Sequence, residues 1–331
     1  MAHPEAALPQ RSLAPVTLVP LAALLAAVVA VRVTGLGRSE GLEVFALILT
    51  SIVVEALPFV LLGSLVSAAI EVYVPERSLA RIARLPLPIQ VPGAALGGLV
   101  FPVCECGSVP VARRLIERGV HPSAGLAFML AAPVINPVVL LSTWIAYRGF
   151  GIGPEMVVGR AGLGVVVALV AGWALGADGA TRVTARPVTD AHEHRDRGSK
   201  NRNFIAHLSS EFTYMARFVV IGAGLAAALQ TIVPQDIIAG LAGNVVVASL
   251  ALMVLAFVLS LCSEADAFVA ISFTQFSPAA QLAFLVSGPI VDTKLSFLYG
   301  ASFGGRFVPR LISIVVPVVL AGALWFEVLV R

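Results

Sequence analysis

Apolar runs of about 20 residues follow one another through most of this 331-residue chain, and they constrain its fold more than any other feature. An α-helix needs about this length to cross roughly 30 Å of hydrocarbon. Charged residues make up 12% of the chain, against about 25% in soluble domains. Strands of alternating polarity are absent from the sequence, which argues against a membrane β-barrel. The chain is therefore predicted to be an all-α polytopic integral membrane protein.

Seven of these runs are predicted to span the membrane. The first is long and has no clear small-residue cleavage site after it, so we interpret it as a retained helix rather than a secretory signal. The predicted spanning helices are residues 14–31, 42–73, 123–147, 154–175, 212–232, 279–299 and 307–330.

Two further apolar segments, 91–117 and 245–276, are interrupted by polar residues next to the three cysteines of the chain. The stretch from Val91 to Val103 would extend roughly 20 Å as a helix, which is too short to cross alone. Unpaired backbone at membrane depth must line a cavity or be buried in protein. Both segments are therefore predicted to be re-entrant or broken helical hairpins.

The sequences of the two halves of the chain resemble each other. The same interval separates Gly63 from Gly222 and Pro75 from Pro234, and it brings Cys104 within one residue of Cys262. We therefore predict a duplication. The expected domains are an N-terminal segment with the first helix (1–41), repeat 1 (42–177), a basic cytoplasmic linker (178–211) and repeat 2 (212–331).

The distribution of arginines predicts how the halves are oriented. If both broken segments are hairpins, most basic residues share one face, as the positive-inside rule requires. The opposite face keeps Arg32, Arg38, Arg148, Arg160 and Arg331. Each half then crosses three times, which predicts an inverted-topology repeat, an architecture of transporters that bind substrate near the midplane.

The hairpin tips carry the candidate binding residues. Thiolates prefer soft metals and metalloids, so Cys104, Cys106 and Cys262 are predicted ligands of a thiophilic cargo if the two tips meet. The alternative is that each cysteine packs as a small hydrophobe. Their spacing favours free thiols over a disulfide. The remaining candidates at the tips are Glu105, Gly107, Ser108, Ser263, Glu264 and Asp266.

Acidic and amide side chains in the apolar segments form a second group of candidates. A buried carboxylate is costly unless it is paired, hydrated or protonated. Glu264 and Asp292 are predicted to couple proton movement to transport, and Asp292 has the alternative of an internal ion pair with Lys294 or an arginine. Asn136 lies between Pro133 and Pro137, where it offers its amide either to cargo or to freed carbonyl groups.

Four motifs carry a resemblance to a known family: Phe101-Pro-Val-Cys-Glu-Cys-Gly-Ser-Val-Pro110, Ala131-Ala-Pro-Val-Ile-Asn-Pro137, Ser263-Glu-Ala-Asp266 and Gly288-Pro-Ile-Val-Asp-Thr-Lys294. The chain resembles the bacterial predicted-permease family that includes organoarsenical efflux permeases, from residue 42 to the C-terminus. The resemblance implies a multi-pass permease of the bacterial inner (plasma) membrane. It also implies export of trivalent organoarsenicals through paired cysteines.

The expected function is therefore transport of a thiophilic metal(loid), most simply efflux of trivalent (organo)arsenicals. Zinc or another thiophilic divalent metal is the alternative cargo, and an intramembrane thiol oxidoreductase is the alternative of another class. No Cys-x-x-Cys spacing supports dithiol exchange. We expect no enzyme activity and no cofactor. The expected partners are the lipid bilayer and the cargo, with an accessory membrane or metal-binding protein left open and no nucleic acid.

Overall fold

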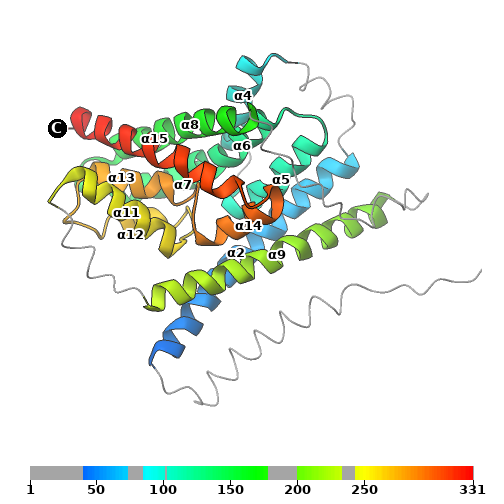
Figure 1. Cartoon of the computed structure of the whole chain (residues 1–331), viewed down its shortest axis with the longest axis horizontal. Helices are drawn as coiled ribbons and strands as arrows, with labels where there is room; N and C mark the ends of the chain where they lie inside the picture. The colour runs from blue at the N-terminus through cyan, green and yellow to red at the C-terminus, as the bar shows by residue number, and fades with distance from the viewer. Residues whose placement is uncertain (1–39, 74–84, 101–102, 178–199, 233–242, 331) are drawn as a thin grey trace, which may run out of the picture.

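A computed structural model describes residues 40–73, 85–100, 103–177, 200–232 and 243–330. All regular structure in these ranges is helical (Figure 1). The predicted helix 14–31 and most of the linker lie outside the described residues. In the first half the helices are α2 (Glu40–Tyr73), α4 (Leu87–Leu96), η1 (Gly97–Leu99), α5 (Glu105–Glu117), α6 (Pro122–Ile135), α7 (Pro137–Tyr147), η2 (Arg148–Phe150) and α8 (Gly153–Ala177).

The second half repeats this order of long and short helices. It contains α9 (Lys200–Ile232), α11 (Val245–Leu259), α12 (Asp266–Ala270), α13 (Pro278–Ser287), α14 (Thr293–Phe303) and α15 (Phe307–Val330). The first of these begins at Lys200 rather than at the predicted residue 212, so the last part of the expected linker is helical. The inverted orientation of the halves and the re-entrant path of the short helices stay predictions.

Five helical stretches in the described part of the chain are long and apolar enough to cross a membrane. They are Gly41–Tyr73, Pro122–Phe150, Gly153–Ala177, Phe204–Thr231 and Phe307–Val330, and each matches a predicted spanning helix. The prediction of one continuous helix over 279–299 is wrong. Here α13 ends at Ser287, because Gly288 and Pro289 do not support helix continuation, and α14 starts again after its N-cap Asp292.

The matching helix pair in the first half has a similar interruption, as the two prolines predict. Asn136 separates α6 from α7, and its side-chain oxygen accepts a hydrogen bond from the Val138 amide at 3.0 Å. Pro137 occupies the first position of α7, where its missing N–H costs nothing. The side-chain oxygen of Asn136 thus caps α7 by accepting from a backbone N–H, whereas the predicted structural role was to donate to freed carbonyl groups.

The short helices α5 and α14 lie between two layers of the molecule. Helices α2 and α9 pack side by side, while α6, α8, α13 and α15 pack in the body above them in Figure 1. Helix α5 contacts α2, α14 contacts α9, and α5 and α14 contact each other. The N-termini of both short helices are therefore held inside the bundle.

The two glycines that align in the sequence allow this close packing. A Cβ atom on Gly63 of α2 would lie 2.5 Å from the Cα of Gly107 in α5, and one on Gly222 of α9 would lie 2.7 Å from the Cα of Lys294 in α14. Side chains at these positions would overlap the neighbouring backbone. Each glycine thus lets a long helix approach a short one, α2 against α5 and α9 against α14.

Ion pairs fasten one end of this assembly. Arg114 of α5 lies 3.3 Å from a carboxylate oxygen of Glu71 in α2 and 3.2 Å from one of Glu211 in α9. Arg118 lies 2.8 Å from the same oxygen of Glu71. These contacts tie the far end of α5 to both long helices, so its N-terminus is positioned from two directions.

Candidate cargo site

Three carboxylates lie at or next to the N-termini of short helices. Glu105 is the first residue of α5, Asp266 is the first residue of α12, and Asp292 is the N-cap of α14. The Asp292 Oδ1 atom accepts a hydrogen bond from the Leu295 amide at 2.6 Å. Negative charge is favourable at these positions because the unpaired N–H groups of a helix N-terminus carry partial positive charge.

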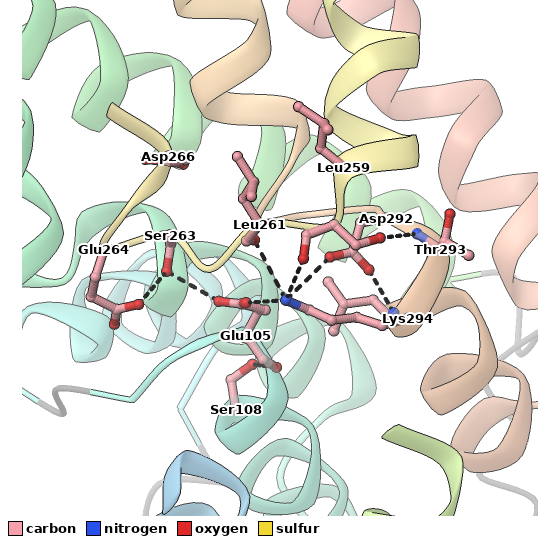
Figure 2. A network of polar contacts seen from close by, with 12 residues as sticks. Glu105, Ser108, Leu259, Leu261, Ser263, Glu264, Asp266, Asp292, Thr293 and Lys294 are labelled. Carbon is pink, nitrogen blue, oxygen red and sulfur yellow. Dashed lines mark hydrogen bonds and ion pairs between the residues drawn. The ribbon is translucent and has the colours of Figure 1, made fainter. Parts of the chain in front are cut away.

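Glu105 forms an ion pair that connects the two halves of the chain. Its side chain is fully buried, and its Oε1 atom accepts a hydrogen bond from the Lys294 Nζ atom at 2.9 Å (Figure 2). A charge buried in this way requires a partner, because its transfer from water alone would be very unfavourable. The pair holds α5 against α14.

Lys294 has three further oxygen partners. Its ammonium group donates to the carbonyl oxygens of Ser260 at 3.0 Å and Leu261 at 3.4 Å, and it lies 3.6 Å from Asp292 Oδ2. Figure 2 shows the Lys294 nitrogen at the centre of these groups. The ion pair between Asp292 and Lys294 is thus present, which was the structural alternative considered for Asp292.

The carbonyl partners belong to the Cys262 loop, residues 260–265, which separates α11 from α12. The Ser263 hydroxyl in this loop donates to Glu105 Oε2 at 3.1 Å and also lies 3.4 Å from Glu264 Oε2. The Cys262 thiol and the Glu264 carboxylate of the same loop lie within 4.8 Å of each other. The loop therefore presents a thiol and a carboxylate next to Glu105.

These contacts produce a set of potential metal ligands. The set consists of Glu105, Cys262 and Glu264, and each places one ligand atom within 4.8 Å of those of the other two. It is the group of at least three potential ligands found in the described part of the chain. Glu105 and Cys262 are buried, and Glu264 is partly exposed. A thiol with two carboxylates offers one soft and two hard ligands to a cation.

The other two predicted thiol ligands lie close by but outside this set. Cys104 and Cys106 are both buried. All three cysteines are free, which confirms the prediction of free thiols. Cys104 is the N-cap of α5, so it and Cys106 flank Glu105 on the chain.

The remaining predicted residues support the surrounding backbone. The Ser108 hydroxyl donates to the carbonyl oxygens of Glu105 at 3.0 Å and Met129 at 3.1 Å, which fastens α5 to α6. Gly107 makes the close contact with Gly63. These two residues position the N-terminus of α5, while Asn136 caps α7 at a separate break.

Asp266 has a partner that the sequence analysis misplaced. The Arg160 guanidinium donates to both Asp266 carboxylate oxygens, at 2.8 and 2.6 Å. It also donates to Thr143 Oγ1 at 2.8 Å and to the Ser263 carbonyl oxygen at 3.3 Å. Arg160 is fully buried in α8. Its assignment to a charged membrane face is therefore wrong, because its position inside a spanning helix forces it to pair within the bundle.

A signal for Arg160 was present in the sequence. It lies in the predicted spanning helix 154–175, where an ionisable residue is expected to face the protein interior and to have a partner. Two further polar residues in apolar segments follow the same rule, since the Tyr147 hydroxyl donates to Gln281 Oε1 at 2.7 Å. Neither pairing could be found from spacing, because the partners are far apart in the chain.

A bundle of apolar helices that encloses broken helices and paired charges is typical of membrane transporters. A family model described as a predicted permease matches residues 42–328, and the chain belongs to this predicted-permease family. The chain is thus a membrane permease and a multi-pass protein of the plasma membrane.

Two relatives are similar over most of their length. The "UPF0718 protein YcgR" of Bacillus subtilis is 43% identical over 281 residues, which cover 84% of this chain and 95% of the relative. The "Putative two-component membrane permease complex subunit" of Streptococcus mutans is 35% identical over 285 residues, which cover 83% and 92%. No solved structure is significantly similar to this chain.

Proposed function

We propose that this permease transports a thiophilic metal or metalloid species and that the Cys262 loop and the N-terminus of α5 bind it. The observation that carries the proposal is the set Glu105, Cys262 and Glu264, in which a thiol lies within 4.8 Å of two carboxylates. Backbone at a helix break offers further unpaired polar groups to a ligand.

Trivalent (organo)arsenicals are the first proposed cargo, and export is the proposed direction. Trivalent arsenic prefers sulfur ligands, and all three thiols of the chain are buried at the two cysteine-bearing breaks. Cys104 and Cys106 lie on either side of Glu105 on the chain, at the same helix N-terminus as this proposed ligand. The resemblance to permeases that export organoarsenicals agrees with this choice.

Zinc or another thiophilic divalent metal is the second candidate. Zinc accepts both thiolate and carboxylate ligands, and the two carboxylates next to Cys262 specifically favour a cation. A partner subunit is an additional proposal, because the Streptococcus mutans relative is named as a subunit of a permease complex.

A carrier is proposed here rather than an enzyme. An intramembrane thiol oxidoreductase would use a reactive dithiol, whereas the Cys-x-x-Cys spacing typical of such enzymes is absent from this sequence. Coupling to the proton gradient through Glu264 or Asp292 stays a prediction. It is checked by measuring cargo efflux before and after an uncoupler collapses the gradient.

The test is cargo accumulation in cells that lack their own arsenic and zinc exporters. Cells with the wild-type permease are compared with cells carrying Cys262→Ser, Cys104→Ser or Cys106→Ser, in the presence of trivalent methylarsenical, arsenite or zinc. We expect Cys262→Ser to reduce export at least about tenfold, since even residues that merely support a metal ligand have effects of this size.

The matched control is Ser272→Ala, which removes an exposed hydroxyl that bonds only a nearby carbonyl oxygen. It should export the cargo as the wild type does. Protein levels in the membrane fraction must be equal for every variant. Wild-type export of every cargo by all three cysteine variants would contradict the proposed thiol site.

A further inference from the structure

The contacts of Lys294 have a consequence for cargo selection that rests on the proposed function. The ammonium group lies within 3.6 Å of four oxygen atoms, from Glu105, Ser260, Leu261 and Asp292. Two are carboxylate oxygens and two are backbone carbonyl oxygens of the Cys262 loop. Such oxygens are also the ligands that a metal cation takes from a protein.

The stability of α14 does not account for a cation at this position. Lys294 is the second residue of α14, and positive charge is unfavourable at a helix N-terminus. Its side chain is almost completely buried, with 3% exposed. The compensating attraction comes from Glu105 and Asp292, so the lysine is held by the site rather than by its own helix.

Asp292 pairs with Lys294 without a hydrogen bond between them, and one of its own carboxylate oxygens lacks a hydrogen bond within the described part of the chain. The Asp292 Oδ2 atom is buried and has no hydrogen-bond partner among the residues that the structure describes, although it faces the Lys294 ammonium group at 3.6 Å. A buried carboxylate oxygen without a hydrogen bond is uncommon in folded proteins and calls for a functional explanation. It lies next to the same ammonium group that Glu105 binds.

Glu105 is shared between this lysine and the proposed cargo ligands. Its Oε1 atom bonds Lys294, while the same carboxylate belongs to the set with Cys262 and Glu264. A cation bound by that set would lie close to the ammonium charge and would compete with it for Glu105. We propose that Lys294 is a specificity-determining residue, an internal cation that competes with cationic cargo and so sets the charge that the cargo carries.

The surrounding charges make the effect selective. Arg160 pairs with Asp266, and within the described ranges the ion pair of Glu105 is with Lys294. A divalent metal ion must displace the ammonium group or be repelled by it, whereas an uncharged trivalent arsenical can bind the thiols without this conflict. Lys294 thereby favours the uncharged cargo over the divalent ion.

The test is a binding titration of the purified full-length protein with Zn²⁺ and, separately, with trivalent methylarsenical. Lys294→Gln removes the positive charge, and we expect it to raise the affinity for Zn²⁺ at least about tenfold. This gain corresponds to a modest part of the Coulomb energy between two close charges at a protein site. Lys294→Arg keeps the charge and should bind Zn²⁺ as weakly as the wild type. The arsenical affinity should change less than about threefold, because an uncharged ligand has no net Coulomb interaction with the lysine.

A second variant decides the question if Lys294→Gln does not fold. Asp292→Asn removes a negative charge next to Lys294 while keeping a good N-cap residue. We expect it to weaken Zn²⁺ binding. Size-exclusion chromatography identifies the folded variants.

The outcomes separate this proposal from the proposed function. The role of Lys294 is overturned if folded Lys294→Gln binds Zn²⁺ no more tightly than the wild type, or if its affinity for the arsenical rises in parallel with its affinity for Zn²⁺. It is also overturned if Asp292→Asn binds Zn²⁺ as the wild type does. If the protein binds the arsenical but no variant binds Zn²⁺, the role of Lys294 is overturned and the proposed arsenical cargo is not. Binding of neither probe by any variant overturns the proposed cargo class together with it.

Discussion

Two buried cations, Arg160 and Lys294, hold opposite ends of the Cys262 loop, yet they do so with different geometry. Arg160 contacts the end of the loop at Ser263 and binds both oxygens of Asp266, at 2.8 and 2.6 Å. Lys294 contacts the beginning of the loop at Ser260 and Leu261 and shares its charge between two carboxylates.

The difference follows from the chemistry of the two side chains. The planar guanidinium group matches a carboxylate with two parallel hydrogen bonds, whereas an ammonium group is a point charge on a flexible stem. The Arg160 pair is thus suited to fix one end of the loop. The Lys294 pair is suited to exchange partners, and it contains the carboxylate that belongs to the proposed ligand set.

Removing the cation from the fixed end should have the largest effect. Arg160→Met leaves Asp266 buried without its partner, and breaking a buried ion pair in this way costs about 3–5 kcal/mol of stability. Thermal unfolding in detergent measures the loss. The double variant Arg160→Met/Asp266→Leu should recover part of it, because no uncompensated charge remains. Wild-type stability of the single variant would refute the view of this pair as an anchor.

A change near the end of the loop that Lys294 contacts should lower stability less and leave the Arg160–Asp266 pair intact. Gly63→Ala places a methyl group against the backbone of Gly107 and pushes α5 away, which costs about 1–3 kcal/mol as other overpacked sites do. Because α5 carries Glu105, cargo binding should fall as well. Gly224→Ala is the control, since a Cβ atom there meets nothing within 4 Å. Equal behaviour of the two variants would show that the α2–α5 contact does not position Glu105.

An effect within the same range is expected from removing the hydroxyl group between the two ends. Ser263→Ala removes the hydrogen bond to Glu105 Oε2. A hydrogen bond to a charged group contributes about 1.5–3 kcal/mol to stability, and we expect a loss near the lower value because Lys294 still pairs with Glu105. Unfolding measurements and a cargo titration check both consequences. A stability loss without any change in cargo binding would separate Ser263 from the site.

The apolar runs and prolines of the sequence predicted much of the fold. Five expected spanning helices are present because each run has the length and composition that a bilayer requires. The break at Asn136 was also predictable, since two neighbouring prolines remove backbone donors. The matching break before Asp292 was missed, because a single Gly-Pro pair in an apolar run is a weaker signal.

The site was predicted in its parts but not in its pairing. Polar residues next to cysteines marked the segments that carry the potential ligand set, so Glu105, Cys262 and Glu264 were all candidates. The structure groups one thiol with two carboxylates, and binding of a cargo by all three thiols stays a prediction. Charge counting also placed Arg160 on a membrane face, although its helix buries it.

The sequence by itself determined that this chain is a helical membrane protein with polar breaks, since local length, composition and proline position decide those properties. Only the tertiary structure decided that Glu105 pairs with Lys294 and Asp266 with Arg160. These partners are separated by 189 and 106 residues. Their pairing depends on how α5, α8, α12 and α14 pack, and a buried charge takes whichever opposite charge that packing brings within reach.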